Sequence, residues 1–167
     1  MKGRCFFLKK GDYMERAVRT SAKALIIRDG RMLAVRLRDG VEVFHIMPGG
    51  GQHAGEPLPD AAAREVAEEL GVRVRVGDLA FVIEGTEGEA FHRVDMVFRC
   101  EYLGEIEGAA LQGDTNQVGF DWLDVATLNH STLYPSKLRR AIMNLCEGKP
   151  QAAYLGVENV GDPEENG

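Results

Sequence analysis

The feature that most constrains the fold is a glycine cluster that leads into one helix bounded on both sides. Residues 49–51 are three consecutive glycines that end an extended stretch. Residues 60–70 are mostly strong helix formers. Pro57 and Pro59 fit only the first turn of a helix, and Gly71 is the residue expected just past its end. The sequence therefore predicts a helix over residues 60–70.

Extended segments precede and follow this helix, and a second helix closes the chain. The predicted strands are 24–27, 32–35, 41–47, 72–76, 79–84, 91–103 and 118–123. Helical spacing of apolar residues predicts the last helix over residues 134–146. Strands on both sides of a central helix predict an α/β (α+β) layered domain around a mixed sheet.

The 167 residues suit one domain with two terminal segments. We expect an N-terminal extension over residues 1–20, the folded domain over residues 21–150 and an acidic tail over residues 151–167. Both ends are expected to be solvated, although the basic start could also contact phosphate or form an interface. Residues 156–167 contain no bases and four acids, Glu158, Asp162, Glu164 and Glu165.

Composition excludes several classes of protein. The formal net charge of −6 argues against binding to a nucleic-acid polymer through a basic face. No apolar run approaches the roughly 18 residues needed to span a membrane. The three cysteines, Cys5, Cys100 and Cys146, are too few and too scattered for a disulfide framework or a zinc cluster. These observations predict a cytoplasmic protein.

Three glutamates in the predicted helix indicate a metal site. Glu65, Glu68 and Glu69 stand at i, i+3 and i+4, so they share one helix face. If partly buried, a pair of carboxylates some 4 Å apart would repel by about 4 kcal/mol at an effective dielectric of about 20. A hard cation such as Mg²⁺ removes that cost and creates a Lewis-acid site for a diphosphate. Taken alone, the three glutamates favour a solvated acidic face, because acidic helix faces are common.

The complete pattern decides between these readings through a resemblance to a known family. The segment reads Gly50-x5-Glu56-x7-Arg64-Glu65-Val66-Ala67-Glu68-Glu69-Leu70-Gly71-Val72 and matches the Nudix box at every fixed position. A chance match is on the order of one in ten million from average residue usage. The strand order over residues 21–146 also resembles the Nudix (MutT-like) hydrolases. The resemblance implies an α/β/α sandwich with a central mixed β-sheet.

The resemblance also implies roles for the residues of the box. Glu65, Glu68, Glu69 and the carbonyl of Gly49 would ligate Mg²⁺ or Mn²⁺. Arg64 would orient a box glutamate, and Glu56 would brace the loop. Gly50 and Gly51 would let the backbone approach the substrate closely. One helix glutamate, or a carboxylate from a later loop, would act as the general base.

Outside the box, the candidates are weaker. Arg36 or Arg38 could pair with a substrate phosphate, although both fit exposed strand charges. Family members often have Glu where this chain has His53. Their late acidic ligand falls near the neutral residues Asn116 and Gln117, so Asp114 is the nearest candidate. Other candidates are Glu84, Glu87 and Glu89 as a source of the base, and Phe44, Phe91 and Trp122 for stacking on a nucleobase, although Trp122 is expected in the core.

The resemblance therefore implies a metal-dependent hydrolase that cuts the pyrophosphate bond of a nucleoside diphosphate linked to another moiety. Two alternatives are a non-catalytic nucleotide-binding module, which usually lacks a box glutamate, and an isomerase, which needs an added cysteine or acid pair. The candidate substrates are oxidised nucleoside triphosphates, ADP-ribose, nucleotide sugars and dinucleoside polyphosphates. Pro135 lies beyond Trp122 and gives little support to ADP-ribose. Homodimers are frequent in the family.

Overall fold

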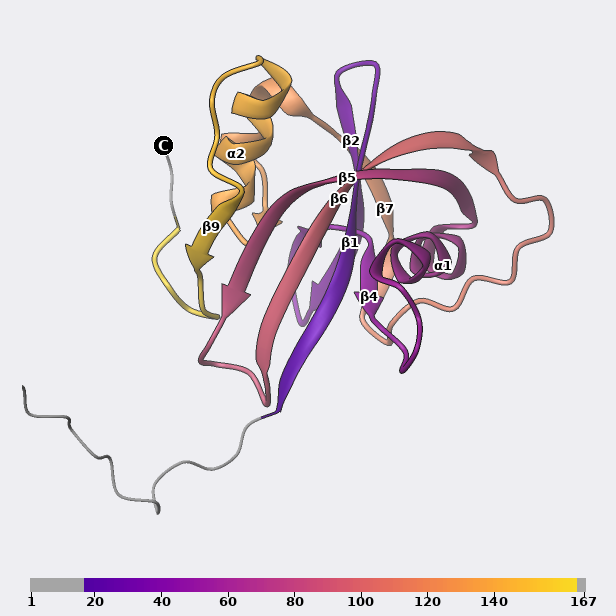
Figure 1. The fold of residues 1–167 in the computed structure, drawn as a ribbon, viewed down its shortest axis with the longest axis horizontal. Helices are drawn as coiled ribbons and strands as arrows, with labels where there is room; N and C mark the ends of the chain where they lie inside the picture. The colour runs from indigo at the N-terminus through magenta and orange to yellow at the C-terminus, as the bar shows by residue number, and fades with distance from the viewer. Residues whose placement is uncertain (1–16, 165–167) are drawn as a thin grey trace, which may run out of the picture.

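The structure is a computed structural model that describes residues 17–164. A curved mixed sheet of nine strands forms its centre (Figure 1). Seven strands follow the order β8-β3-β2-β1-β6-β5-β9, while β4 pairs with β1 and β7 pairs with β2. The β1–β6, β3–β8 and β5–β9 pairs are parallel, and the other pairs are antiparallel. The strands are β1 (Val18–Arg28), β2 (Arg31–Asp39), β3 (Glu42–Ile46), β4 (Gly49–Gly51), β5 (Val72–Gly85), β6 (His92–Glu105), β7 (Gln117–Asp124), β8 (Leu133–Tyr134) and β9 (Tyr154–Val157).

Two α-helices lie on opposite sides of the sheet, and this confirms the mixed α/β architecture (Figure 1). Helix α1 (Leu58–Leu70) packs on one face through Ala61, Ala62 and Val66. Helix α2 (Lys137–Cys146) and the 3₁₀ helix η1 (Val125–His130) cover the other face.

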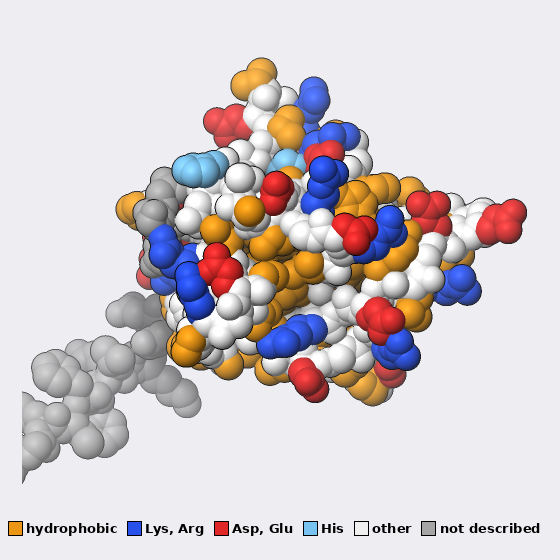
Figure 2. Space-filling view, turned by 90° about the horizontal axis from the view of Figure 1, so that it is seen from above, with side chains coloured by type: hydrophobic (Ala, Val, Ile, Leu, Met, Phe, Trp, Pro, Cys, Tyr) orange, Lys and Arg blue, Asp and Glu red, His pale blue; other side chains and the backbone are white. Residues whose placement is uncertain are grey.

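Strand β1 contributes to both cores because its side chains alternate between the two faces. Ala22, Ala24 and Ile26 pack toward α1, whereas Leu25 and Ile27 pack toward α2. Seen from above, hydrophobic side chains gather at the centre of the surface, with charged side chains around them (Figure 2).

The glycine cluster is part of the sheet. Residues 49–51 form β4, in which Gly49 pairs with Lys23 of β1. Gly49 has φ of 127°, and a Cβ atom there would lie 2.1 Å from the carbonyl oxygen of Ala22. Only glycine allows this approach, so strand pairing fixes the backbone in front of α1.

Several boundaries differ from those predicted. Helix α1 begins at Leu58 rather than residue 60, and ends as expected with Gly71 in the left-handed conformation. The two strands predicted over residues 72–84 are one strand, β5, with irregular pairing between Val76 and Phe81. Helix α2 begins at Lys137 rather than residue 134, because Leu133–Tyr134 pair with β3 as β8.

The C-terminal segment differs from the expected solvated tail. Tyr154–Val157 form β9, which joins the edge of the sheet beside β5. Glu158 is buried, and its carboxylate accepts hydrogen bonds from the backbone N–H groups of Ser136 and Lys137 at the start of α2. At the other end, β1 starts inside the expected extension, and residues 1–16 and 165–167 lie outside the described part of the chain.

Within residues 17–164, no helix is both long enough and apolar enough to cross a membrane.

Candidate active site

Arg64 connects the glycine-rich segment to the acidic face of α1. Its Nε and Nη2 atoms donate to the two carboxylate oxygens of Glu56, at 2.8 and 3.0 Å. Nη2 also donates to the carbonyl of Gly51, at 3.0 Å. Nη1 donates to Glu65 at 2.7 Å and to Glu68 at 3.1 Å. One planar guanidinium thus holds three carboxylates and the loop backbone, which the single ammonium of a lysine cannot do.

The Arg64–Glu56 pair is ionised at neutral pH. The pKa of Glu56 is lowered to about 2, mainly by the side-chain hydrogen bonds from Arg64 and, to a smaller extent, by the hydrogen bond from the backbone N–H of His53. The same pairing raises the pKa of Arg64 above its ordinary value. Glu56 therefore lies where a bracing residue would lie, between α1 and the loop that precedes it.

Glu69 is directed toward the glycine strand. Its carboxylate is buried and accepts a hydrogen bond of 2.9 Å from the backbone N–H of Gly49. Lys23 donates to the carbonyl of the same glycine at 2.6 Å. Burial raises the pKa of Glu69 to about 7, against the effects of the Gly49 N–H and the Lys23 charge. The charges of Glu65 and Asp114 raise it further.

Gly50 is in contact with the carboxylate of Glu65. A Cβ atom at residue 50 would lie 2.6 Å from that carboxylate, closer than side chains approach. At Gly51, a Cβ atom would meet nothing within 4 Å. The absence of a side chain at Gly50 thus leaves room for Glu65 against the backbone of β4.

The chemistry of the donor set fits a hard divalent cation. Glu65, Glu68 and Glu69 offer carboxylate oxygens, and Gly49 offers a carbonyl, which are the ligands that Mg²⁺ and Mn²⁺ prefer. In residues 17–164, however, no three acidic, histidine or cysteine side chains converge as they would around a bound ion. The cause is visible in the contacts: Glu65 and Glu68 both turn to Arg64, while Glu69 turns to the backbone.

The net charge of the cluster also fits a divalent cation. Glu56, Glu65 and Glu68 bond Arg64, while Lys23 bonds Gly49 and lies close enough for its charge to lower the pKa of Glu69. When all six groups are ionised, four negative and two positive charges leave about −2, which one divalent cation balances.

The segment after β6 closes the C-terminal end of α1. The backbone N–H of Gln112 donates to the carbonyl of Glu68 at 2.7 Å, and the side-chain amide of Gln117 donates to that of Glu69 at 3.0 Å. These contacts satisfy carbonyls that have no partner within the helix. Asp114, in the same segment, lies near enough for its charge to raise the pKa of Glu69. Gln117 thus contacts the backbone of α1.

Arg36 belongs to a separate polar cluster formed by β2, β3 and β7. Its Nη1 atom donates to both oxygens of Asp121, at 3.0 and 3.2 Å. The Nε2 atom of His45 lies 2.8 Å from the same carboxylate, and its Nδ1 atom lies 2.9 Å from the hydroxyl of Thr132. Sequence reasoning missed Asp121, because only strand register brings these residues together.

The remaining candidates have other surroundings. His53 is exposed, with its ring 3.9 Å from Glu56. Glu84 bonds His92 and Tyr154, and Glu89 pairs with Arg93. Trp122 is partly buried against the core under α1. Arg38 and Glu87 are exposed, and Phe44 packs edge-on against Tyr134.

The match to a protein family decides the identity of this arrangement. The model of the family described as the NUDIX domain matches residues 18–145. The chain belongs to the Nudix family. All the box residues named above lie within the matched Nudix segment.

Individual proteins agree with this Nudix assignment. A MutT-like protein of Streptomyces ambofaciens is 38% identical over 88 residues, which cover 52% of this chain and 54% of that protein, so the chain spans about half the length of this relative. A NUDIX hydrolase from Nitrosomonas europaea has a TM-score of 0.67 at 20% identity, covering 80% of this chain and 91% of that one. An ADP-ribose pyrophosphatase from Streptococcus suis has a TM-score of 0.61 at 17% identity, covering 84% and 98%. The two structures confirm the Nudix fold.

Proposed function

We propose that this Nudix protein hydrolyses the pyrophosphate bond of a nucleoside diphosphate linked to another moiety, with Mg²⁺ or Mn²⁺ as the cofactor. The observation that carries the proposal is the grouping of Glu65, Glu68 and Glu69 around Arg64 and the glycine strand β4. The ADP-ribose pyrophosphatase from Streptococcus suis, which has the same fold, acts on a substrate of this class.

Glu65, Glu68, Glu69 and the carbonyl of Gly49 would hold the metal ion. A bound divalent cation polarises phosphoryl oxygens and lowers the pKa of a coordinated water. To bind a metal ion, Glu65 and Glu68 would give up some of the hydrogen bonds that they accept from Arg64. The carbonyl of Gly49 would likewise give up the hydrogen bond that it accepts from Lys23.

The chain's own residues orient the ligands and the substrate. Arg64 keeps the helix carboxylates grouped, and Glu56 fixes Arg64 from the other side. Gly51 leaves the backbone of β4 open to a diphosphate, because nothing lies within 4 Å of its Cβ position, whereas the space at Gly50 is taken by the carboxylate of Glu65. We assign the general base to a carboxylate of α1 or to Asp114, which lies nearest among the later loop acids.

Arg36 is the candidate contact for a substrate phosphate. Its Nη1 atom is engaged by Asp121, whereas Nη2 makes only a 3.4 Å contact with the carbonyl of Val118. A guanidinium has five N–H donors, so Nη2 can donate to an anion while the ion pair persists.

The test is a screen for nucleoside monophosphate products, separated by ion-exchange chromatography, over a panel of nucleoside triphosphates, nucleotide sugars, ADP-ribose and dinucleoside polyphosphates. Each substrate is assayed with Mg²⁺, with Mn²⁺ and with a chelator. Turnover that depends on metal and is lost in Glu68→Gln supports the proposal. Glu101→Gln is the matched control, because Glu101 is an exposed glutamate of β6 that pairs with Arg75 of β5.

The absence of turnover with every substrate would instead favour a nucleotide-binding module. In that case, a nucleotide should still raise the melting temperature of the protein, because ligands that bind the folded state stabilise it. Activity that persists in the chelator would contradict the metal assignment.

A further inference from the structure

A pocket of about 330 Å³ lies beside the C-terminal end of α1 and is separate from the cluster of glutamates. Its walls come from α1, the core strands and the segment after β6. Three aromatic residues, Tyr102, Phe120 and Trp122, line it together with Leu33, Leu70 and Leu111. We call it the aromatic pocket. Its volume is at the lower end of the range for small-molecule sites.

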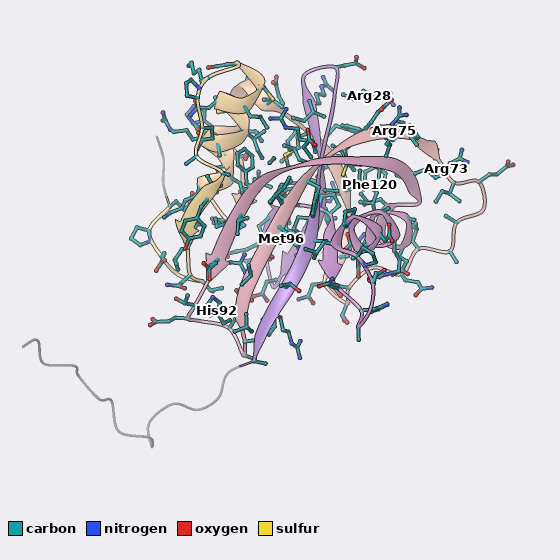
Figure 3. The ribbon with its side chains drawn as sticks, in the orientation of Figure 1. Arg28, Arg73, Arg75, His92, Met96 and Phe120 are labelled. Carbon is teal, nitrogen blue, oxygen red and sulfur yellow. The ribbon has the colours of Figure 1, made fainter. Side chains whose placement is uncertain are left out.

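The aromatic side chains of this pocket form a surface on which a flat ring can stack. Tyr102 and Trp122 pack edge to face, with centroids 6.0 Å apart. The guanidinium of Arg28 lies over both rings, 4.9 Å from Tyr102 and 5.6 Å from Trp122. Phe120 remains 43% exposed, although it lines an apolar pocket. In Figure 3, it is labelled beside α1.

The aromatic pocket lies next to the proposed active site along the chain of α1. Leu70 and Gly71, which line it, directly follow Glu69 at the end of α1. At a rise of about 1.5 Å per residue, Gly71 lies only about 3 Å further along the helix axis than Glu69. The segment that lines the pocket through Leu111 also bonds the carbonyl of Glu68 through the next residue, Gln112.

We propose that the aromatic pocket binds the nucleobase of the substrate, with Phe120 and Trp122 as stacking side chains and Glu105 as a polar contact. Glu105 is the only carboxylate among the lining residues. An ionised carboxylate only accepts hydrogen bonds, so it favours bases whose exocyclic amino group offers two N–H donors over uracil, which offers the single N3–H. The inference rests on the proposed function, because the pyrophosphate must lie at the glutamates for the base to reach this pocket.

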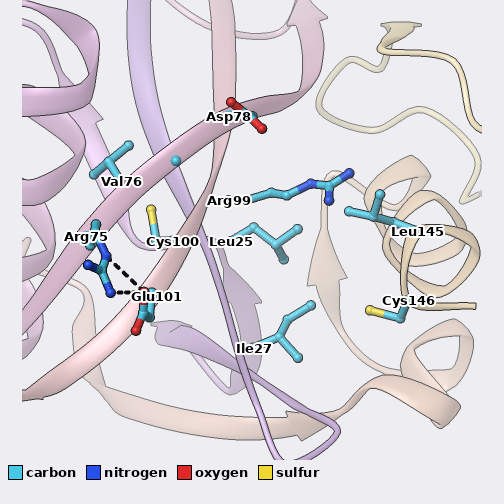
Figure 4. A pocket seen from close by; sticks show the side chains of 11 residues that line it. Leu25, Ile27, Arg75, Val76, Asp78, Arg99, Cys100, Glu101, Leu145 and Cys146 are labelled. Carbon is cyan, nitrogen blue, oxygen red and sulfur yellow. Dashed lines mark hydrogen bonds and ion pairs between the residues drawn. The ribbon is translucent and has the colours of Figure 1, made fainter. Parts of the chain in front are cut away.

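A second pocket, with a larger volume, does not suit the same role. It encloses about 610 Å³ on the side of the sheet that faces α2 (Figure 4). Its floor contains Leu25 and Ile27, and the Arg75–Glu101 ion pair lies at its edge. No residue of α1 lines it, so a ligand there would be separated from the glutamates by the sheet.

The sequence contains a built-in reporter for the aromatic pocket, because Trp122 is its only tryptophan. Tryptophan fluorescence is titrated with AMP, UMP and ribose 5-phosphate, none of which contains a pyrophosphate bond. A saturable change with AMP, a weaker one with UMP and none with ribose 5-phosphate are expected. An equal response to all three, or no response to any, overturns the proposal.

Two variants separate binding in the pocket from general effects on the protein. Phe120→Ala should shift the fluorescence titration to roughly tenfold higher AMP concentration and raise KM roughly tenfold, with kcat within about threefold, because one stacking contact is lost. Val118→Ala is the matched control, since Val118 is also 43% exposed and lies two residues earlier on β7, but does not line the pocket. Equal effects of the two variants overturn the proposal.

A third variant tests the preference among bases. Glu105→Gln should reduce the difference between AMP and UMP, because an amide donates as well as accepts. An unchanged AMP-to-UMP ratio contradicts the role of Glu105.

The outcomes also distinguish this inference from the proposed function. If no pyrophosphate substrate turns over but AMP changes the fluorescence of wild type at roughly tenfold lower concentration than that of Phe120→Ala, the pocket assignment holds and the hydrolase assignment fails. If substrates turn over while no nucleotide affects the fluorescence, only the pocket assignment fails. Concentration-dependent dimerisation that Phe120→Ala removes would assign the surface to a second copy of the chain and overturn the inference.

Discussion

The buried carboxylate of Glu69 accepts a 2.9 Å hydrogen bond from the backbone N–H of Gly49. This contact joins the last turn of α1 to the glycine strand. It depends on the positive φ of Gly49 and on its close approach to Ala22, which the pairing of β4 with β1 enforces. The position of the most buried box glutamate is therefore set by a strand in front of the helix.

Replacing Glu69 with glutamine is expected to remove activity without unfolding the protein. The amide oxygen of glutamine can still accept from Gly49, and no charge has to be buried. The loss of an anionic metal ligand should lower kcat/KM by about 100-fold or more. Steady-state kinetics and thermal melting test this together: a near-wild-type rate would show that Glu69 does not hold the metal.

Gly50→Ala is expected to displace Glu65. The new Cβ would lie 2.6 Å from the Glu65 carboxylate, so the side chain or the strand must move. Overpacking of this kind costs about 1–3 kcal/mol, and activity should fall at least about tenfold. Gly51→Ala is the steric control for stability, because nothing lies within 4 Å of its Cβ. Equal melting temperatures for the two variants would refute the steric argument.

Glu84 is expected to make the stability of the sheet edge depend on pH. The hydrogen bonds with His92, and then with Tyr154 of β9, lower the pKa of Glu84 below its usual 4.5. A lowered folded-state pKa stabilises the protein above the unfolded value, and that contribution disappears as the pH falls through the folded value. Urea unfolding of wild type and Glu84→Gln should thus differ at pH 7 and converge as the pH drops below about 4.5. A gap that stays constant down to pH 3 would rule this out.

Glu158→Ala is expected to destabilise the packing of α2. The carboxylate of Glu158 accepts from the N–H groups of Ser136 and Lys137, which have no partners within the helix. Removing this buried acceptor should cost about 1–3 kcal/mol in the free energy of unfolding. Glu107→Ala, at an exposed position, is the control. If both variants melt together, the buried contact contributes nothing.

Much of the fold follows from local signals. Prolines and Gly71 bound α1 to within two residues, and alternating apolar residues predict most of the strands. Strand β4 was missed because glycine has no side chain to show a strand pattern. Strand β9 was missed because it is only four residues long and its partner strand β5 is about 70 residues away in the sequence.

The sequence by itself determined that Arg64, Glu65, Glu68 and Glu69 share one helix, because their spacing is local and the helix period places them on one face. It also determined the family, since the box is contiguous. Only the tertiary structure decided that Glu69 meets Gly49, that Arg36 pairs with Asp121 and that Trp122 lines a pocket. These contacts join segments up to 85 residues apart, and they depend on strand register and layer packing, which no local pattern specifies.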